Sequence, residues 1–261
     1  MKHNVVREVS ARLVASLAAI FFILTVAPAL AGDRAELNVL GYSEDARYFG
    51  FEEFGTFDGS GGHYSHIYVV DLKDDSWVKG TPFSTETFDD AEDNPLPLSA
   101  VRTKTAALAA PLLKQLKIDA PATTLVLLGD GVPDADGKTM STAFPSCCGP
   151  NNTDESGNLT LTLSTFPSKM TGDCQVDTAF GFALEAKYAD GTSAELHKDG
   201  DTLPKSRSCP QDYRLYSIIA PFEQFGPRVA LISSYPFDFE GTSRRYLAVP
   251  VDGWQSPADS E

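Results

Sequence analysis

Short runs of β-branched and aromatic residues, each ended by turn-forming residues, recur along the chain and restrict its fold more than any other feature. Runs of roughly four to eight such residues predict strands. They occupy residues 48–54, 67–72, 123–128, 158–164, 180–188, 192–197, 213–220, 228–234 and 245–251. The Asp-Gly turn within residues 189–192 predicts a tight hairpin. We therefore expect a mainly β fold of antiparallel sheets, arranged as a sandwich, a small propeller-like fold or a barrel.

One helix is predicted among these strands, at residues 99–117. Apolar side chains and a threonine recur there at steps of three and four, at Val101, Thr105, Leu108, Leu112 and Leu116. Pro111 falls inside the pattern and should kink or divide the helix. Residues 85–97 are acidic and contain proline, so we expect an exposed linker there. Residues 130–158 are rich in Gly, Pro, Asp and Asn, which predicts a long loop.

The first 31 residues have the composition of a secretory signal peptide. Lys2, Arg7 and Arg12 precede an apolar run, and Ala29-Leu30-Ala31 fits a signal-peptidase site. The alternative is an uncleaved membrane anchor, because the apolar run is just long enough to span a bilayer. Cleavage after Ala31 would leave residues 32–261 as a single β-rich domain, secreted or periplasmic, without an integral membrane span.

The charge of the chain argues against two classes of partner. The net charge is −15, and removal of residues 1–31 takes away three positive and one negative side chain, which makes it −17. Such a surface repels nucleic acid and anionic lipid. We therefore expect no nucleic-acid partner, and an envelope or extracellular protein or a glycan instead.

All four cysteines follow the predicted cleavage site, at Cys147, Cys148, Cys174 and Cys209. An even set of cysteines in an exported protein usually forms disulfides. One of the three connectivities requires a strained ring between Cys147 and Cys148, so we expect each of them to pair with one of Cys174 and Cys209. Each bridge would stabilise the fold by roughly 2–5 kcal/mol. A redox-active role for the adjacent pair is the alternative.

Residues that could carry catalysis are few and dispersed. The chain has no Gly-x-Ser-x-Gly segment, and only His63, His66 and His197 remain after cleavage. His63 and His66 are three residues apart, so in a strand they point to opposite faces and cannot chelate one metal ion. We assign no catalytic residue and no cofactor on this basis.

Calcium is the alternative ion, because two predicted loops concentrate carboxylates. These are Asp130, Asp134 and Asp136 in the first loop, and Asp199 and Asp201 in the second. The first loop has Pro145 where an EF-hand places its bidentate glutamate. Asp-Gly turns alone account for these acids, so we assign no cofactor and keep calcium at the first loop as the alternative.

The adjacent carboxylates Glu52 and Glu53 lie on opposite faces of a predicted strand and cannot flank one glycosidic bond. Near the C-terminus, Arg244 and Arg245 supply two guanidinium groups that need acceptors. We therefore expect a structural ion pair between Arg244 or Arg245 and Glu52 or Glu53. The hairpins at residues 47–70 and 228–249 also resemble each other, which would place them side by side and join the chain ends, unless the similarity is chance.

Two resemblances follow from particular motifs. Residues 41–51, Gly-Tyr-Ser-Glu-Asp-Ala-Arg-Tyr-Phe-Gly-Phe, resemble the repeat of TolB-type β-propellers, with Ala46 where that repeat usually has glycine. The chain also resembles a family of predicted secreted bacterial proteins with a domain of unknown function. Its expected motifs are the same opening turn, the Asp-Gly-Ser-Gly loop at 58–61 and the Glu-Gly-x-x-Arg-Arg segment at 240–245. This resemblance implies a location and a fold, and no activity.

Two classes of function fit these observations. The first is a periplasmic or secreted binding or envelope-associated protein, with β edges and the loop at residues 55–64 as its contact surface. The second is a hydrolase whose acidic residues come from distant segments. A cleft lined by two or more carboxylates with perturbed pKa values would favour the hydrolase, and an exposed aromatic groove without them would favour the binding protein.

Overall fold

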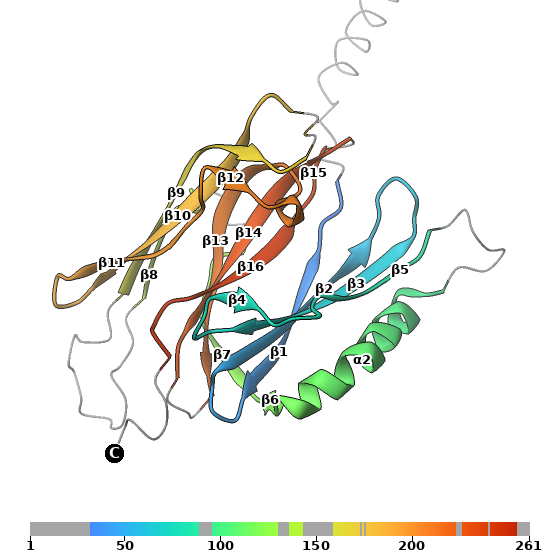
Figure 1. Cartoon of the computed structure of the whole chain (residues 1–261), viewed down its shortest axis with the longest axis horizontal. Helices are drawn as coiled ribbons and strands as arrows, with labels where there is room; N and C mark the ends of the chain where they lie inside the picture. Colours follow the sequence, from blue (N-terminus) through green and yellow to red (C-terminus); the bar gives the residue numbers. More distant parts are fainter. Residues whose placement is uncertain are drawn as a thin grey trace, which may run out of the picture. The chain divides into compact units, whose positions relative to one another are not determined.

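The chain folds into three β-sheets, mainly antiparallel, and a long helix, in agreement with the predicted fold class (Figure 1). The computed structural model describes residues 32–88, 96–129, 136–142, 159–172, 174, 176–222, 226–239 and 241–254. The predicted signal peptide lies outside these residues. Within the described ranges, no helix is both long and apolar enough to cross a membrane.

Sheet A contains the first strands of the chain. Its order is β4 (Ser76–Trp77), β3 (His63–Asp71), β2 (Tyr48–Thr56), β1 (Glu36–Ser43) and β6 (Ile118–Ala120), and β5 (Phe83–Glu86) also pairs with β3. β5 ends inside the segment that we expected to be a linker, which begins at Thr85, and Thr85 is buried. The linker prediction was therefore wrong for these residues, because their pairing with β3 covers them.

Sheets B and C contain the later strands. Sheet B has the order β11 (Ser193–Lys198), β10 (Ala179–Tyr188), β9 (Leu159–Met170) and β12 (Thr202–Leu203), with β8 (Thr139–Thr142) on β9. Sheet C has the order β15 (Gly241–Thr242), β14 (Val229–Asp238), β13 (Pro210–Pro221) and β7 (Ala122–Leu127), with β16 (Arg245–Pro250) on β14. The turn at residues 189–192 joins β10 to β11 as predicted. β8 lies where we predicted only a loop.

Sheet C lies between the other two sheets, and β14 shows why. Val229 and Leu231 pack in one core cluster with Phe49 and Phe51 of sheet A. Ala230 and Ile232, which point to the opposite face, pack in a second cluster that includes Phe182 and other residues of sheet B. A strand covered on both faces needs an unbroken apolar run, which residues 229–232 provide.

The helix α2 (Leu98–Gln115) packs on sheet A (Figure 1). Its buried residues are Val101, Thr105 and Ala109, and the hydroxyl of Thr105 donates a hydrogen bond of 3.3 Å to the carbonyl of Ser65. Val101 and Thr105 are buried as predicted, but Leu108 is 50% exposed and Ala109 is buried in its place. Pro111 lies within the helix and does not divide it.

The start of the described chain meets the start of β16 at the junction of sheets A and C, whereas Trp254 at its other end donates a hydrogen bond to the carbonyl of Asp45. Residues 33–35 run parallel to the start of β16: Ala35 N–H donates to the carbonyl of Arg244 at 3.2 Å, and Arg244 N–H donates to the carbonyl of Asp33 at 2.8 Å. The first and last hairpins also share a core cluster. They face each other across two sheets, however, and β2 pairs with β1 and β3 rather than with a late strand.

Cys174 and Cys209 form a disulfide with each other, with their Cα atoms 5.8 Å apart. The expectation that each would pair with Cys147 or Cys148 was therefore wrong. The reason lies in sheet B, where β12 pairs in parallel with the end of β9 and brings the two cysteine-bearing connections together. Cys147 and Cys148 lie outside the described residues.

Candidate ligand groove

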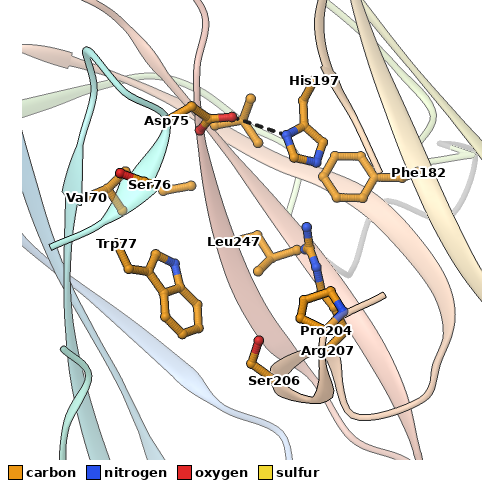
Figure 2. A pocket seen from close by; sticks show the side chains of 12 residues that line it. Val70, Asp75, Ser76, Trp77, Phe182, His197, Pro204, Ser206, Arg207 and Leu247 are labelled. Atoms are coloured by element: carbon orange, nitrogen blue, oxygen red, sulfur yellow. Dashed lines mark hydrogen bonds and ion pairs between the residues drawn. The ribbon is translucent and has the colours of Figure 1, made fainter. Parts of the chain in front are cut away.

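A groove opens where the edges of sheets A and C meet the connection that follows β12 (Figure 2). It consists of two adjoining cavities of about 220 Å³ and 150 Å³ that share Trp77, Ser206, Arg207 and Leu247. We call this feature the junction groove and define it by Asp75 of the β3–β4 turn, Trp77 of β4, Ser206 and Arg207 of the 3₁₀ helix η3 (Lys205–Arg207), and Leu247 and Ala248 of β16. Together the two cavities form one elongated site.

One wall of the groove is aromatic. Trp77 lies on the two-residue strand β4 at the edge of sheet A, and its ring packs 5.1 Å from the ring of Tyr68. The Trp77 side chain is nevertheless 39% exposed. Figure 2 shows its ring facing the cavity, opposite Arg207 and Pro204 and with Leu247 between the two walls. A large apolar surface is therefore available to a ligand.

The opposite wall is a fixed network of charges. Asp199 accepts a hydrogen bond of 2.7 Å from Nη2 of Arg207 and lies 3.2 Å from Nε2 of His197, whose Nδ1 lies 3.2 Å from Asp75. The guanidinium of Arg207 also lies over the ring of Phe182 at 5.3 Å. Among the described residues, Nη1 of Arg207 is buried and has no hydrogen-bond partner. The described protein groups therefore leave the hydrogen-bonding capacity of Nη1 unsatisfied.

Protonation strengthens this network. Burial of the His197 ring opposes its positive charge, but hydrogen bonds to Asp199 and Asp75 and their charges outweigh burial and raise the pKa of His197 to about 9. Burial also acts against the Asp199 carboxylate, but His197 and Arg207 outweigh it and hold the pKa of Asp199 below its ordinary value. At neutral pH His197 is therefore a cation and Asp199 a carboxylate, each held by hydrogen bonds to the other.

The smaller of the two cavities, of about 150 Å³, is lined by a buried carboxyl group, Glu53. It is 1% exposed, it accepts a hydrogen bond from the backbone N–H of Tyr246, and the hydroxyl of Tyr68 donates to its Oε2 at 3.2 Å. Burial outweighs the charge of Arg245 and these hydrogen bonds, and raises the pKa of Glu53 to about 7. His66 lines the same cavity, and burial lowers its pKa although Glu86 lies 3.2 Å away.

The carboxylates and arginines that we expected to pair have other main partners. Glu52 binds Arg102 of α2 through two hydrogen bonds of 2.9 and 2.7 Å. Arg245 donates to the hydroxyl of Tyr64 at 2.8 Å and acts on Glu53 through its charge. Arg244 donates to the carbonyl of Ala35 at 2.6 Å. The sequence could not identify Arg102, because the packing of a helix on a distant strand leaves no local signal.

The other candidates from the sequence lie elsewhere or have different roles. Asp199, considered as a calcium ligand, is an ion-pair partner of Arg207. Asp130 and Asp134 lie outside the described residues, and within the described residues no group of three or more His, Cys, Asp or Glu side chains could hold a metal ion. The loop at residues 55–64, expected as a contact surface, contributes Gly59 and Ser60 to a separate cavity.

The turn that resembles the TolB-type repeat joins β1 to β2, outside the junction groove. Ala46 adopts a φ of 53°, a backbone region that glycine enters without steric cost.

A comparison with the curated proteins gives no match. Residues 50–252 match a family described as predicted secreted protein (DUF2259). The matched segment runs from β2 to the residues just after β16 and includes every residue that defines the junction groove. The family description agrees with the predicted location outside the cytoplasm. The chain therefore belongs to this family of predicted secreted proteins.

Proposed function

We propose that this protein is an exported binding protein that holds its ligand in the junction groove. The observation that carries the proposal is the pairing of an exposed aromatic wall, Trp77, with a rigid charged wall that ends in the unpartnered Nη1 of Arg207. Binding sites typically combine apolar surface with a few fixed polar groups, because the fixed groups orient the ligand at little entropic cost. An envelope or extracellular protein or a glycan is the expected class of partner.

The carboxylates of the groove support binding better than hydrolysis. A glycosidase needs two carboxyl groups that face one bond, one of them protonated. Glu53 has the raised pKa, but both of its oxygens accept hydrogen bonds from the protein. Asp75, the other carboxylate of the groove, is held by His197. Among the described residues of the groove, Glu53 has a raised pKa but lacks a second carboxyl group that faces the same bond. The hydrolase is therefore the second candidate function.

Tryptophan fluorescence tests the proposal directly. The chain has two tryptophans, so a Trp254→Phe variant leaves Trp77 as the only one. We expect a member of a peptide or oligosaccharide library to change the emission of Trp77 and to raise the melting temperature, since a ligand that binds only the folded state stabilises it.

Two variants locate the site. Trp77→Ala and Arg207→Gln should each weaken binding at least tenfold. Phe239→Ala provides the control, because Phe239 is 89% exposed and lies outside the groove. The proposal fails if neither library yields a ligand, or if the ligands found bind both groove variants as tightly as the parent protein. Turnover of a library member that Glu53→Gln abolishes would establish the hydrolase instead.

A further inference from the structure

The floor of the groove is the open edge of a β-sheet. β16 pairs with β14 on one side only, and its other side faces the groove. Backbone N–H groups alternate in direction along a strand, so every second residue of β16 points away from β14. Two contacts identify these outward residues: Arg244 N–H donates to the carbonyl of Asp33, and Tyr246 N–H donates to the carboxylate of Glu53. The next outward residues are Ala248 and Pro250.

Three of these four outward positions are already protected. Residues 33–35 pair with Arg244, Glu53 accepts from Tyr246, and Pro250 has no N–H. Proline is tolerated in a strand where its missing N–H would have faced outward. Ala248 differs, because no described residue pairs with its outward N–H and C=O. It is half-buried and lines the larger cavity, as Trp77 and Arg207 do.

The protein itself shows how such an edge is filled. At Arg244, the extended residues 33–35 accept a hydrogen bond from its N–H and donate one to its C=O. Ala248 lies four residues later and offers the same pair of groups with the same orientation. A peptide main chain supplies the matching N–H and C=O at the strand repeat, whereas a saccharide has no such repeat.

We propose that the ligand of the junction groove is an extended peptide segment of another protein, which adds as a short strand to β16 at Ala248 in the way that residues 33–35 add at Arg244. Nη1 of Arg207 donates to an oxygen of this peptide, and Trp77 packs against one of its side chains. The inference rests on the proposed function and specifies its ligand.

Proline substitution tests the strand addition. Ala248→Pro removes only the outward N–H and leaves the bonds to β14 in place, so the variant should fold. Ala248→Val is the matched control, because it adds similar bulk and keeps the N–H. The probe is a synthetic library of seven-residue peptides with blocked ends, applied to the protein purified from the producing cell. We expect bound peptides to lose at least tenfold in affinity for Ala248→Pro and less than twofold for Ala248→Val.

Amide hydrogen exchange gives a second measurement that does not depend on the proline variant. In the wild-type protein, saturating peptide should slow the exchange of the Ala248 amide at least tenfold. Unchanged exchange, or equal peptide affinity for the Pro and Val variants, would overturn the strand addition. If only oligosaccharides bind, and Trp77→Ala abolishes that binding, the groove function stands and the peptide inference is wrong. If neither library binds, both are wrong.

Discussion

Replacing Glu53 by glutamine should make the protein more stable at neutral pH, although Glu53 is fully buried and hydrogen-bonded. The pKa of Glu53 rises from an ordinary 4.5 to about 7 on folding. Between these two pH values the folded state binds more protons than the unfolded state, so stability decreases as the pH rises. One pKa unit corresponds to about 1.4 kcal/mol, so ionisation of Glu53 costs about 3 kcal/mol above pH 7.

Glutamine has the shape of protonated glutamate and no charge. Its amide oxygen can accept from Tyr246 N–H, and its NH₂ group can donate to the hydroxyl oxygen of Tyr68. We therefore expect Glu53→Gln to match the wild type near pH 4.5 and to exceed it by about 3 kcal/mol at pH 8. Urea unfolding at several pH values measures this difference, which cancels the contributions of all other titrating groups.

The neighbouring Glu52 is the matched control, because it should show the opposite sign. Burial acts against its charge, but hydrogen bonds from Arg102, Ser65 and Asn38 outweigh burial and lower the pKa of Glu52. Because the pKa of Glu52 is lowered in the folded state, the ionised carboxylate stabilises the protein at pH values above 4.5. This stabilisation is lost as the pH falls through the folded-state pKa. Glu52→Gln should therefore destabilise the protein at pH 8 by about 1–2 kcal/mol, since Arg102 is 35% exposed and water weakens the pair. Destabilisation by both glutamine variants at pH 8 would refute the reasoning.

Three further outcomes are expected. Non-reducing peptide mapping should join Cys174 to Cys209, and replacing both by serine should cost about 4 kcal/mol, because the bridge closes a loop with a sequence separation of 35. Mass spectrometry of the exported protein should find an N-terminus at Gly32, and an intact Met1 form in the membrane would contradict cleavage. NMR titration of His197 should give a pKa above 8 that falls in Asp199→Asn; a value near 6.5 in the wild type would remove the fixed charged wall.

The strands that the sequence predicted are those that carry their own local signal. The apolar run of β14 and the Asp-Gly turn before β11 are complete within a few residues, and both lie where they were expected. Errors occurred where long-range pairing decides the structure. The polar segment of β8 and the linker-like β5 become strands only because β9 and β3 offer them hydrogen bonds. Leu108 was predicted to be buried, but the packing of α2 on sheet A buries Ala109 instead.

The groove was not predictable, because its residues come from three separate connections and edges. Trp77, Arg207 and Ala248 have no recognisable spacing in the sequence, and none of them was singled out. Asp199 was singled out as an acid in a turn, and its role became visible only when β10 and η3 placed Phe182 and Arg207 beside it. The expectation that a β edge would provide the contact surface was general, and the structure indicates which edge and which residue to test.

The cost of Glu53 also supports the groove as the functional site. Burial raises the pKa of Glu53 to about 7, so this carboxyl group is expected to lower stability at neutral pH. Such costs and strongly shifted pKa values concentrate at functional sites. Glu53 lines the smaller cavity, and its carboxylate accepts a hydrogen bond from the outward N–H of Tyr246. A peptide strand that enters the groove therefore finds that position filled, and Ala248 is the position on β16 where it can pair.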